Sequence, residues 1–379
     1  MAALGRVIAE AIVHHYDRNE LLRRLANPFW FQSFGAVMGM DWHSSGITTS
    51  VIGALKRGLA PVQHELGIFV CGGRGAQSRR TPLELASMGE RTGLDASPLI
   101  RTSRLVAKID SAVVQDGYDL YLHGFFASVE GAWCIVQQGM NPAQREARRY
   151  HWQSEGMVGF FDTPHVAIEG RNVGAIINLA DGEAAPSRSA SLELVRQGPD
   201  PLIATLRQFA EPYAGTLDLF AAQEPHLRMP AHHDLQAPDV DLKRLHSTLA
   251  AAADRGPTDF ADLLLTPGIG ARTVASVAFV AEVIHGAPCR FRDPARFALA
   301  HGGKDGHPFP VPLKVYDETI AVLKRAIGHA KLGRHEALEA IRRLDVQARR
   351  LDEVLQGPTL SEYIAVEREH SPSYGGRCV

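Results

Sequence analysis

The sequence predicts an α+β protein, with a mixed N-terminal domain that holds a small antiparallel sheet and an all-α C-terminal domain. Residues 118–138 contain two aromatic and aliphatic runs around Ser-Val-Glu-Gly, which is the pattern of a β-hairpin. Residues 67–73 read as a further strand that enters a glycine turn. From residue 245 onward, apolar residues recur at helical spacing instead.

Helices are expected around these strands. Apolar positions at three- and four-residue spacing predict one helix over residues 4–26, which ends at Asn27-Pro28. A second helix is expected over residues 47–57. A third begins near Pro82 as its first residue, with Thr81 as its cap.

The stretch LLLTPGIGARTVASVAFVAEV at residues 263–283 carries the clearest functional signal. Two helical segments flank Thr-Pro-Gly-Ile-Gly, whose glycines tolerate positive φ and let the backbone approach a phosphate closely. The second helix begins there, so its unpaired N–H groups would face the anion. The turn resembles the helix-hairpin-helix of DNA repair proteins. The alternative is a tight corner between two packed helices that binds nothing.

If the turn binds nucleic acid, it contacts the backbone and gives affinity without sequence specificity. Ile269 is expected to point inward and fix the turn to the core. The nucleic-acid-binding residues expected from this interpretation are Thr266, Gly268, Ile269, Gly270, Arg272, Thr273 and, in a later Gly-Gly-Lys-Asp-Gly loop, Lys304.

Four regions follow from these patterns. Residues 1–185 form the mixed domain with a candidate active site, and residues 186–244 form an irregular, acidic connector rich in Pro, Asp and Ala. Residues 245–330 form the helix-hairpin-helix domain. Residues 331–379 form a C-terminal helix and a disordered tail.

Composition and charge narrow the function classes. Apolar runs are interrupted before the ~18–20 residues that a membrane helix needs, and the absence of a Cys-x-x-Cys pair argues against a zinc ribbon or a disulfide framework. A cytoplasmic location is the expectation. Residues 155–262 hold 16 Asp+Glu against 8 Lys+Arg, and residues 286–350 hold 13 Lys+Arg against 7 Asp+Glu. This segregation suggests one acidic and one basic lobe, although charge also varies along any chain.

Three fragments of the first half have acids, bases and histidines that suggest a functional site and not only a structural role: MGMDWHSSGITT, SRLVAKIDSAVVQDGYDLYLHG and QQGMNPAQREARRYHW. Metal-dependent nucleases need two or three adjacent carboxylates that hold Mg²⁺ or Mn²⁺. Asp41, Asp110 and Asp116 are the candidates for this role. Lys108, His43 and His151 would add charge stabilisation or proton transfer. The alternative is that each acid is a surface charge or a cap.

Aromatic residues in the same fragments could stack unpaired bases, although such residues more often belong to a core. They are Trp42, Tyr118, Tyr121, Trp133 and Trp152.

Two other functions compete with the nuclease. In glycosylases that carry the hairpin, a catalytic Asp follows it by roughly two dozen residues, and Asp293 lies 25 residues after Gly268. Asp293 would stabilise a sugar cation without a metal, or it would simply cap a helix at residues 294–300. The second competitor is a DNA-binding adaptor without catalytic activity.

The chain resembles the uncharacterised domain-of-unknown-function family 763. The resemblance lies in LLRRLANPFWFQSFGAVMGMDWHSSGITTSVIGALK, SRLVAKIDSAVVQDGYDLYLH, VQQGMNPAQREARRYHW, LLLTPGIGARTVASVAFVAEVIHG and CRFRDPARFALAHGGKDGHPFPVP. It covers most of residues 20–325 and implies that the N-terminal region and the hairpin work as one unit. Members usually open with a further segment before the first helix.

The leading hypothesis is therefore a DNA repair or processing enzyme, a metal-dependent nuclease that grips the backbone through the hairpin. The expected partner is nucleic acid, with DNA favoured over RNA and no membrane. A homo-oligomer formed through the C-terminal helix is a further expectation.

Overall fold

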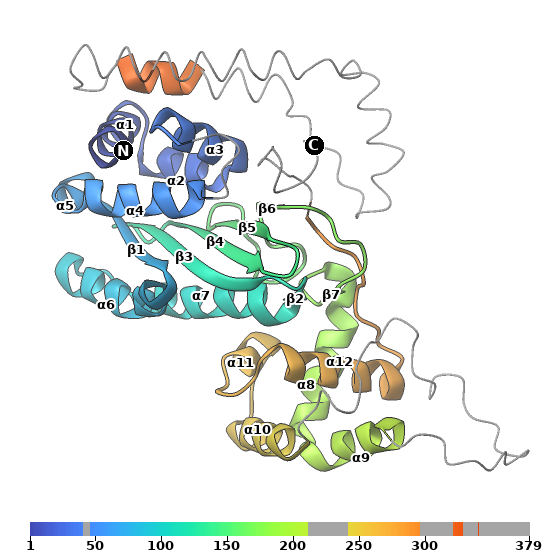
Figure 1. Ribbon diagram of the computed structural model, residues 1–379. Coiled ribbons are helices and arrows are strands. Elements are labelled where there is room, and N and C mark those ends of the chain that lie inside the picture. Colours follow the sequence, from blue (N-terminus) through green and yellow to red (C-terminus); the bar gives the residue numbers. More distant parts are fainter. Residues whose placement is uncertain (41–45, 211–241, 296–320, 329–339, 341–379) are drawn as a thin grey trace, which may run out of the picture.

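The fold was analysed in a computed structural model, which describes residues 1–40, 46–210, 242–295, 321–328 and 340. These residues form a mixed α+β structure, as the sequence predicts. An antiparallel sheet lies between two layers of helices, and further helices continue from one end of the sheet (Figure 1).

The main sheet has five strands in the order β1-β3-β4-β5-β6, and every neighbouring pair is antiparallel. The hairpin predicted over residues 118–138 is confirmed, since Ala127 pairs with Trp133 across the Ser-Val-Glu-Gly turn. The strand predicted over residues 67–73 is confirmed as well. The strands are β1 (Ile68–Arg74), β3 (Asp119–Ser128), β4 (Trp133–Asn141), β5 (Glu146–Gln153) and β6 (Ala167–Glu169). A two-stranded sheet joins β2 (Val114–Gln115) to β7 (Ile177–Asn178).

One face of the sheet is covered by the N-terminal helices (Figure 1). The prediction of a single helix over residues 4–26 is wrong, because the first helix ends before Tyr16. The side chain of Asp17 then accepts a hydrogen bond from the Glu20 amide, which caps a second helix. The helices of this face are α1 (Ala2–His15), α2 (Arg18–Ala26), α3 (Pro28–Val37), α4 (Ile47–Leu59) and α5 (Gln63–Leu66).

The opposite face is covered by α6 (Thr81–Thr92) and α7 (Ser97–Lys108) (Figure 1). A 3₁₀ segment, η1 (Gly75–Arg80), leads from β1 into α6, and a π-helical turn, η2 (Ile109–Val113), follows α7. Thr81 is the first residue of α6 and not its cap, and its hydroxyl donates to the carbonyl of Ser78.

Helices also occupy the start of the region predicted to be an irregular connector. That prediction is wrong for residues 186–210, where the prolines lie in the first turns of helices, the position at which a helix accepts proline. Residues 211–241 lie outside the described part of the chain. The elements that follow the sheet are η3 (Gly182–Ala184), α8 (Ala185–Arg196), α9 (Pro199–Ala210), α10 (Leu242–Arg255), α11 (Phe260–Leu264) and α12 (Ala271–His285).

The apolar core is divided by the sheet. One cluster lies between the sheet and α1–α4, and the other runs continuously from the α6–α7 face into α8–α12, joining residues such as Phe125 and Phe279. Of the aromatics that could stack bases, Tyr118, Trp133 and Trp152 are buried in the structure and serve as core. Trp42 lies outside the described residues.

Candidate nucleic-acid interface

A cleft of about 590 Å³ opens beside α7 and the first residues of β3. It combines three kinds of side chain: cations on its walls, a serine and a histidine on its floor, and an apolar residue from the C-terminal helices. Its lining residues include Arg79, Arg104, Lys108, Ser103, His123 and Leu265.

Exposed arginines lie in and next to the segments that line this cleft, and two of them, Arg79 and Arg104, line it directly. Arg101, Arg104 and Lys108 follow one another at spacings of three and four residues, so they project from one side of α7. Within the described residues, no carboxylate forms an ion pair with any of the five exposed arginines of this region. We call this surface the basic face; its arginines are Arg74, Arg79, Arg80, Arg101 and Arg104.

The turn between α11 and α12 lies against this region. The ammonium of Lys108 donates a hydrogen bond to the carbonyl of Ile269, and the side-chain amide of Gln115 donates one to the carbonyl of Ala271 at 2.9 Å. Burial lowers the pKa of Lys108. Leu265, which ends α11, lines the cleft. The turn is therefore held beside the basic face by polar contacts as well as by the shared core.

The turn matches part of the expectation. Ile269 points inward and is buried, whereas Gly268 and Arg272 are exposed. Gly268 has φ +89°, which L side chains rarely adopt. Gly270 caps the first turn of α12 with extended backbone.

The two threonines of the turn differ from the expectation. Thr266 and Thr273 are buried, and the Thr266 hydroxyl donates to the carbonyl of Asp262, so neither side chain is presented to a phosphate. Lys304, the remaining predicted contact, lies outside the described residues.

The floor of the cleft is a chain of hydrogen bonds. Ser103 Oγ lies 2.9 Å from His123 Nε2, and His123 Nδ1 lies 2.6 Å from Gln137 Oε1. His123 and Gln137 are direct partners across the β3–β4 ladder, which places them side by side. Gln137 Nε2 donates to the carbonyl of Val106 and to Asp110. All of these side chains are buried, and burial lowers the pKa of His123.

Asp110 belongs to the interior. Its Oδ2 accepts from Gln137 and from Trp152 Nε1 at 2.9 Å, and its Oδ1 lies 2.6 Å from His165 Nε2. No surface of this carboxylate is exposed.

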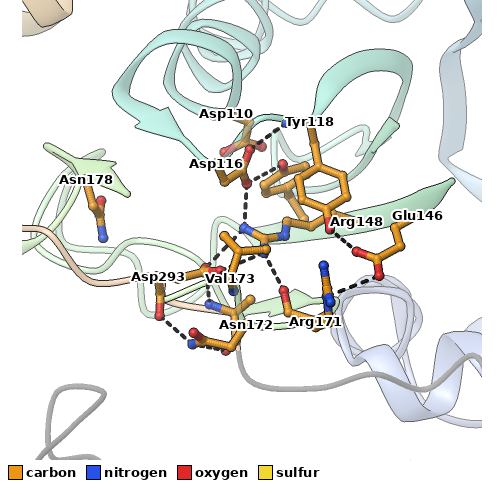
Figure 2. Close-up of polar contacts among 12 residues, drawn as sticks. Asp110, Asp116, Tyr118, Glu146, Arg148, Arg171, Asn172, Val173, Asn178 and Asp293 are labelled. Carbon is orange, nitrogen blue, oxygen red and sulfur yellow. Dashed lines mark hydrogen bonds and ion pairs between the residues drawn. The ribbon is translucent and has the colours of Figure 1, made fainter. Parts of the chain in front are cut away.

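Asp116 is also held on both oxygens. Its Oδ1 accepts from the Tyr118 amide, and its Oδ2 accepts from Arg148 at 2.8 Å and from the Tyr150 hydroxyl at 2.7 Å (Figure 2). These protein donors occupy the positions that a metal ion would need.

Arg148 joins Asp116 to Asp293. Its guanidinium contacts both oxygens of Asp293, at 3.1 and 2.7 Å, and Asp293 also accepts from the amides of Val173 and Ala295 (Figure 2). Asp293 is buried, so it has no oxygen free for a sugar cation. This arrangement does not support the glycosylase hypothesis. The bond to the Ala295 amide agrees with the capping alternative, although the helix expected over 294–300 extends outside the described residues.

The Mg²⁺ or Mn²⁺ site predicted at Asp41, Asp110 and Asp116 stays a prediction. The described residues do not support it. Asp110 and Asp116 are saturated by protein donors, and Asp41 and His43 lie outside the described part of the chain. Across residues 1–40, 46–210 and 242–295, no three His, Cys, Asp or Glu side chains gather as a metal site would require.

His151 was predicted to transfer protons, and its surroundings contradict that role. The ring is fully buried on the other side of the sheet, edge-on to Phe31 and beside the backbone of Leu25 and Ala26. Burial, with the nearby charge of Arg149, lowers its pKa well below the usual value. A substrate has no route to this ring, and His151 is a core residue.

The sequence predicts site residues in the fragment SRLVAKID, but the roles expected there fall on Asp110 and Lys108 and not on Ser103 or Arg104. The sequence signal for the basic face is the repeat of Arg101, Arg104 and Lys108 at helical spacing. The contribution of Arg79 depends on how η1 folds beside α7, and no local pattern indicates it. The basic surface was expected in residues 286–350, whereas the described one is built largely from residues 74–108.

Comparison with known proteins gives one match. A family model described as "Protein of unknown function (DUF763)" covers residues 1–311. Neither the curated proteins nor the solved structures include a match to the chain. In the parts of the chain that the structure describes, every helix is too short or too polar to span a membrane.

Proposed function

The chain belongs to the DUF763 family, and we propose that this member binds the sugar-phosphate backbone of nucleic acid, with DNA as the favoured partner, at the basic face and the adjacent 265–270 turn. The binding serves DNA repair or processing.

The observation that carries this proposal is the set of exposed arginines without a described carboxylate partner. Arginine presents a planar fork of donors that suits phosphate oxygens. Each phosphate that such a cation neutralises releases a counterion, which drives association. Cations that served only stability would be expected beside carboxylates, as Arg148 is.

The spread of the charges favours a polymer over a small anion. Arg101 and Lys108 are seven residues apart on α7, which corresponds to about 10 Å along the helix, and the arginines of η1 extend the surface further. One phosphate ion cannot contact this whole surface, whereas successive phosphates of a strand can.

The turn adds a second element of the proposal, a helix-hairpin-helix contact. The first amides of α12 have no partner within the helix, and the start of a helix attracts anions. Gly268 is exposed and has no side chain of its own to shield the backbone of the turn. Because Lys108 and Gln115 fix the turn beside the basic face, one strand can contact both.

Metal-dependent hydrolysis has weaker support than binding. Two of its three expected ligands are occupied by the protein's own donors, so the geometry favours backbone binding as the property to test first.

The test is a titration of labelled single-stranded and double-stranded oligonucleotides, followed by fluorescence anisotropy over a range of salt concentrations. We expect wild-type binding to weaken steeply with salt. The triple variant Arg79→Ala, Arg101→Ala, Arg104→Ala should bind more weakly, with a log–log salt slope about 2–3 units smaller in magnitude, near 0.9 per lost phosphate contact.

Arg57→Ala is the matched control, because Arg57 is an exposed arginine on α4, on the other side of the sheet. Equal loss of affinity in the control and the triple variant, or no salt-sensitive binding by the wild type, would contradict the proposal.

A further inference from the structure

The hydrogen bonds on the floor of the cleft determine the protonation of His123. The carbonyl of Val106 can only accept, so the group that faces it is the NH₂ of Gln137. Gln137 Oε1 therefore faces His123 Nδ1, which must carry a proton. In a neutral ring the other nitrogen, Nε2, is then a free acceptor.

The acceptor nitrogen lies against the hydroxyl of Ser103. Because Nε2 accepts, Ser103 Oγ donates its proton across the 2.9 Å contact. A serine hydroxyl is a weak nucleophile that becomes reactive when an adjacent base accepts its proton, and a third group that orients the base completes such a site. Ser103, His123 and Gln137 stand in these three positions, and all three line the cleft.

A carboxylate next to Gln137 can stabilise the ring of His123 after it accepts a proton. Asp110 lies directly behind Gln137, and its charge favours the protonated form of His123. Desolvation has the larger effect and opposes it, so the ring is neutral at rest. Neutral imidazole is the form in which His123 can act as a base.

The cleft walls indicate the class of substrate. Arg79, Arg104 and Lys108 line the same cleft as Ser103. Cations in these positions favour an ester that is itself anionic and that gains negative charge during reaction. One acidic residue, Asp119, also lines the cleft, so three cations face one carboxylate.

We propose that Ser103 is a nucleophile, with His123 as its general base and Gln137 as the positioning residue, and that it reacts with a phosphodiester held by the cationic walls of the cleft. The choice of a phosphodiester rests on the proposed nucleic-acid function. The assignment of Ser103 and His123 rests on the hydrogen-bond geometry.

The reaction conserves atoms and electrons in two transfers. Ser103 Oγ attacks phosphorus, its proton moves to His123 Nε2, the bond from phosphorus to the leaving oxygen breaks, and that oxygen takes the proton from the imidazolium. The phosphoryl group is then an ester of Ser103. Attack by water or by another hydroxyl, which gives its proton to His123, breaks the Oγ–P bond and returns the proton to Oγ.

The experiment uses bis(4-nitrophenyl) phosphate, an activated phosphodiester that carries no polymer. We expect a burst of about one equivalent of nitrophenolate, and a peptide map by mass spectrometry that places a 4-nitrophenyl phosphate group on Ser103. Ser103→Ala should give neither. His123→Gln should slow the burst by at least about 100-fold, the usual contribution of a general base.

Ser111→Ala is the matched control. Ser111 lies on the turn that follows α7 and lines the same cleft, but its hydroxyl donates to the carbonyl of Ala107 and has no histidine partner. Its burst and adduct should equal those of the wild type. If Ser103→Ala does not fold, Ser103→Cys, with a side chain of similar size, should fold and show no adduct on oxygen.

The outcomes separate this proposal from the proposed function. No burst from the wild type, or equal bursts from Ser103→Ala and Ser111→Ala, overturns the nucleophile. If salt-sensitive DNA binding persists in either case, the binding proposal stands alone. An adduct on Ser103 without any DNA binding supports the nucleophile and overturns the nucleic-acid function.

Discussion

Two regions of this molecule use charged side chains in opposite ways. Around Arg148, two carboxylates, a guanidinium, a tyrosine hydroxyl and three main-chain amides satisfy one another inside the protein (Figure 2). On the basic face, five arginines lie in solvent without a described carboxylate partner. The same residue type is structural in one region and available for a ligand in the other.

The comparison shows why acidic residues were poor guides to the site. Removal of a carboxylate from water is costly unless donors replace the lost water. Asp110, Asp116 and Asp293 have such donors, so they hold strands and segments together. The available groups are instead cations on a helix surface and the Ser103–His123 pair beneath them.

The largest expected effect is a loss of stability when the buried network around Arg148 is disrupted. Asp293→Ala should lower the free energy of unfolding by about 3–5 kcal/mol, because it removes one of the two carboxylates paired with the buried Arg148 and leaves two amides without an acceptor. Chemical denaturation measures this loss. Asp119→Ala, an exposed acid, is the control and should change stability by less than about 0.5 kcal/mol. Equal effects would show that the buried network is dispensable.

A smaller loss of stability is expected when the pH is lowered. Burial lowers the pKa of His123 and His151 in the folded state, below the usual value of about 6.5. The unfolded chain then binds more protons than the folded chain below about pH 6.5, so stability falls as pH falls, by at most about 1.4 kcal/mol per unit for each histidine.

His151→Leu isolates one of these histidines. The side chain fills a similar apolar site and cannot be protonated, so the slope of unfolding free energy against pH should decrease below a pH of about 6.5, by at most about 1.4 kcal/mol per unit. Denaturation at several pH values measures it. An unchanged slope would mean that His151 accepts its proton in the folded protein.

The next smaller effect on stability is expected from a substitution in the 265–270 turn. Gly268→Ala places an L residue at φ +89° and brings its Cβ within 3.1 Å of the Thr248 side chain, so we expect a loss of about 1–2 kcal/mol in stability together with weaker DNA binding. Gly198→Ala is the control, with φ +93° and no neighbouring atom within 4 Å. Gly198→Ala should lower stability only through its backbone conformation and should leave DNA binding unchanged. If both variants bind DNA equally well, the turn does not contact the strand.

Much of the fold follows from local patterns. Aromatic and aliphatic runs with turn residues identify β1, β3 and β4, and the prediction that Ile269 points inward from the glycine turn is also correct. The helices at 185–210 do not follow from the sequence pattern, because proline is typical of irregular structure, whereas here it lies within the first turns of the helices.

The candidate site was less accessible to sequence reasoning because it depends on contacts between distant residues. Asp293 is 145 residues from Arg148, so nothing near it in sequence shows that its charge is neutralised. His123 and Gln137 meet only through the register of β3 and β4, and Ser103 meets them through the packing of α7. A one-residue shift in register would place either side chain on the opposite face.

The smallest expected effects concern single cations of the basic face. Arg104→Ala should reduce the magnitude of the log–log salt slope of DNA binding by about 1, and Arg104→Lys should keep the slope because the charge remains. Both variants should change stability by less than about 0.5 kcal/mol. Anisotropy titrations measure the slopes. A slope that is unchanged in Arg104→Ala would place the strand elsewhere.

The central claim is that a nucleic-acid strand lies across the basic face and the turn. Amide hydrogen exchange of the protein with and without a saturating oligonucleotide tests it most directly. We expect protection at residues 75–80, 101–111 and 265–272, with little change on α1–α5. Protection confined to the α1–α5 side of the sheet would contradict the account.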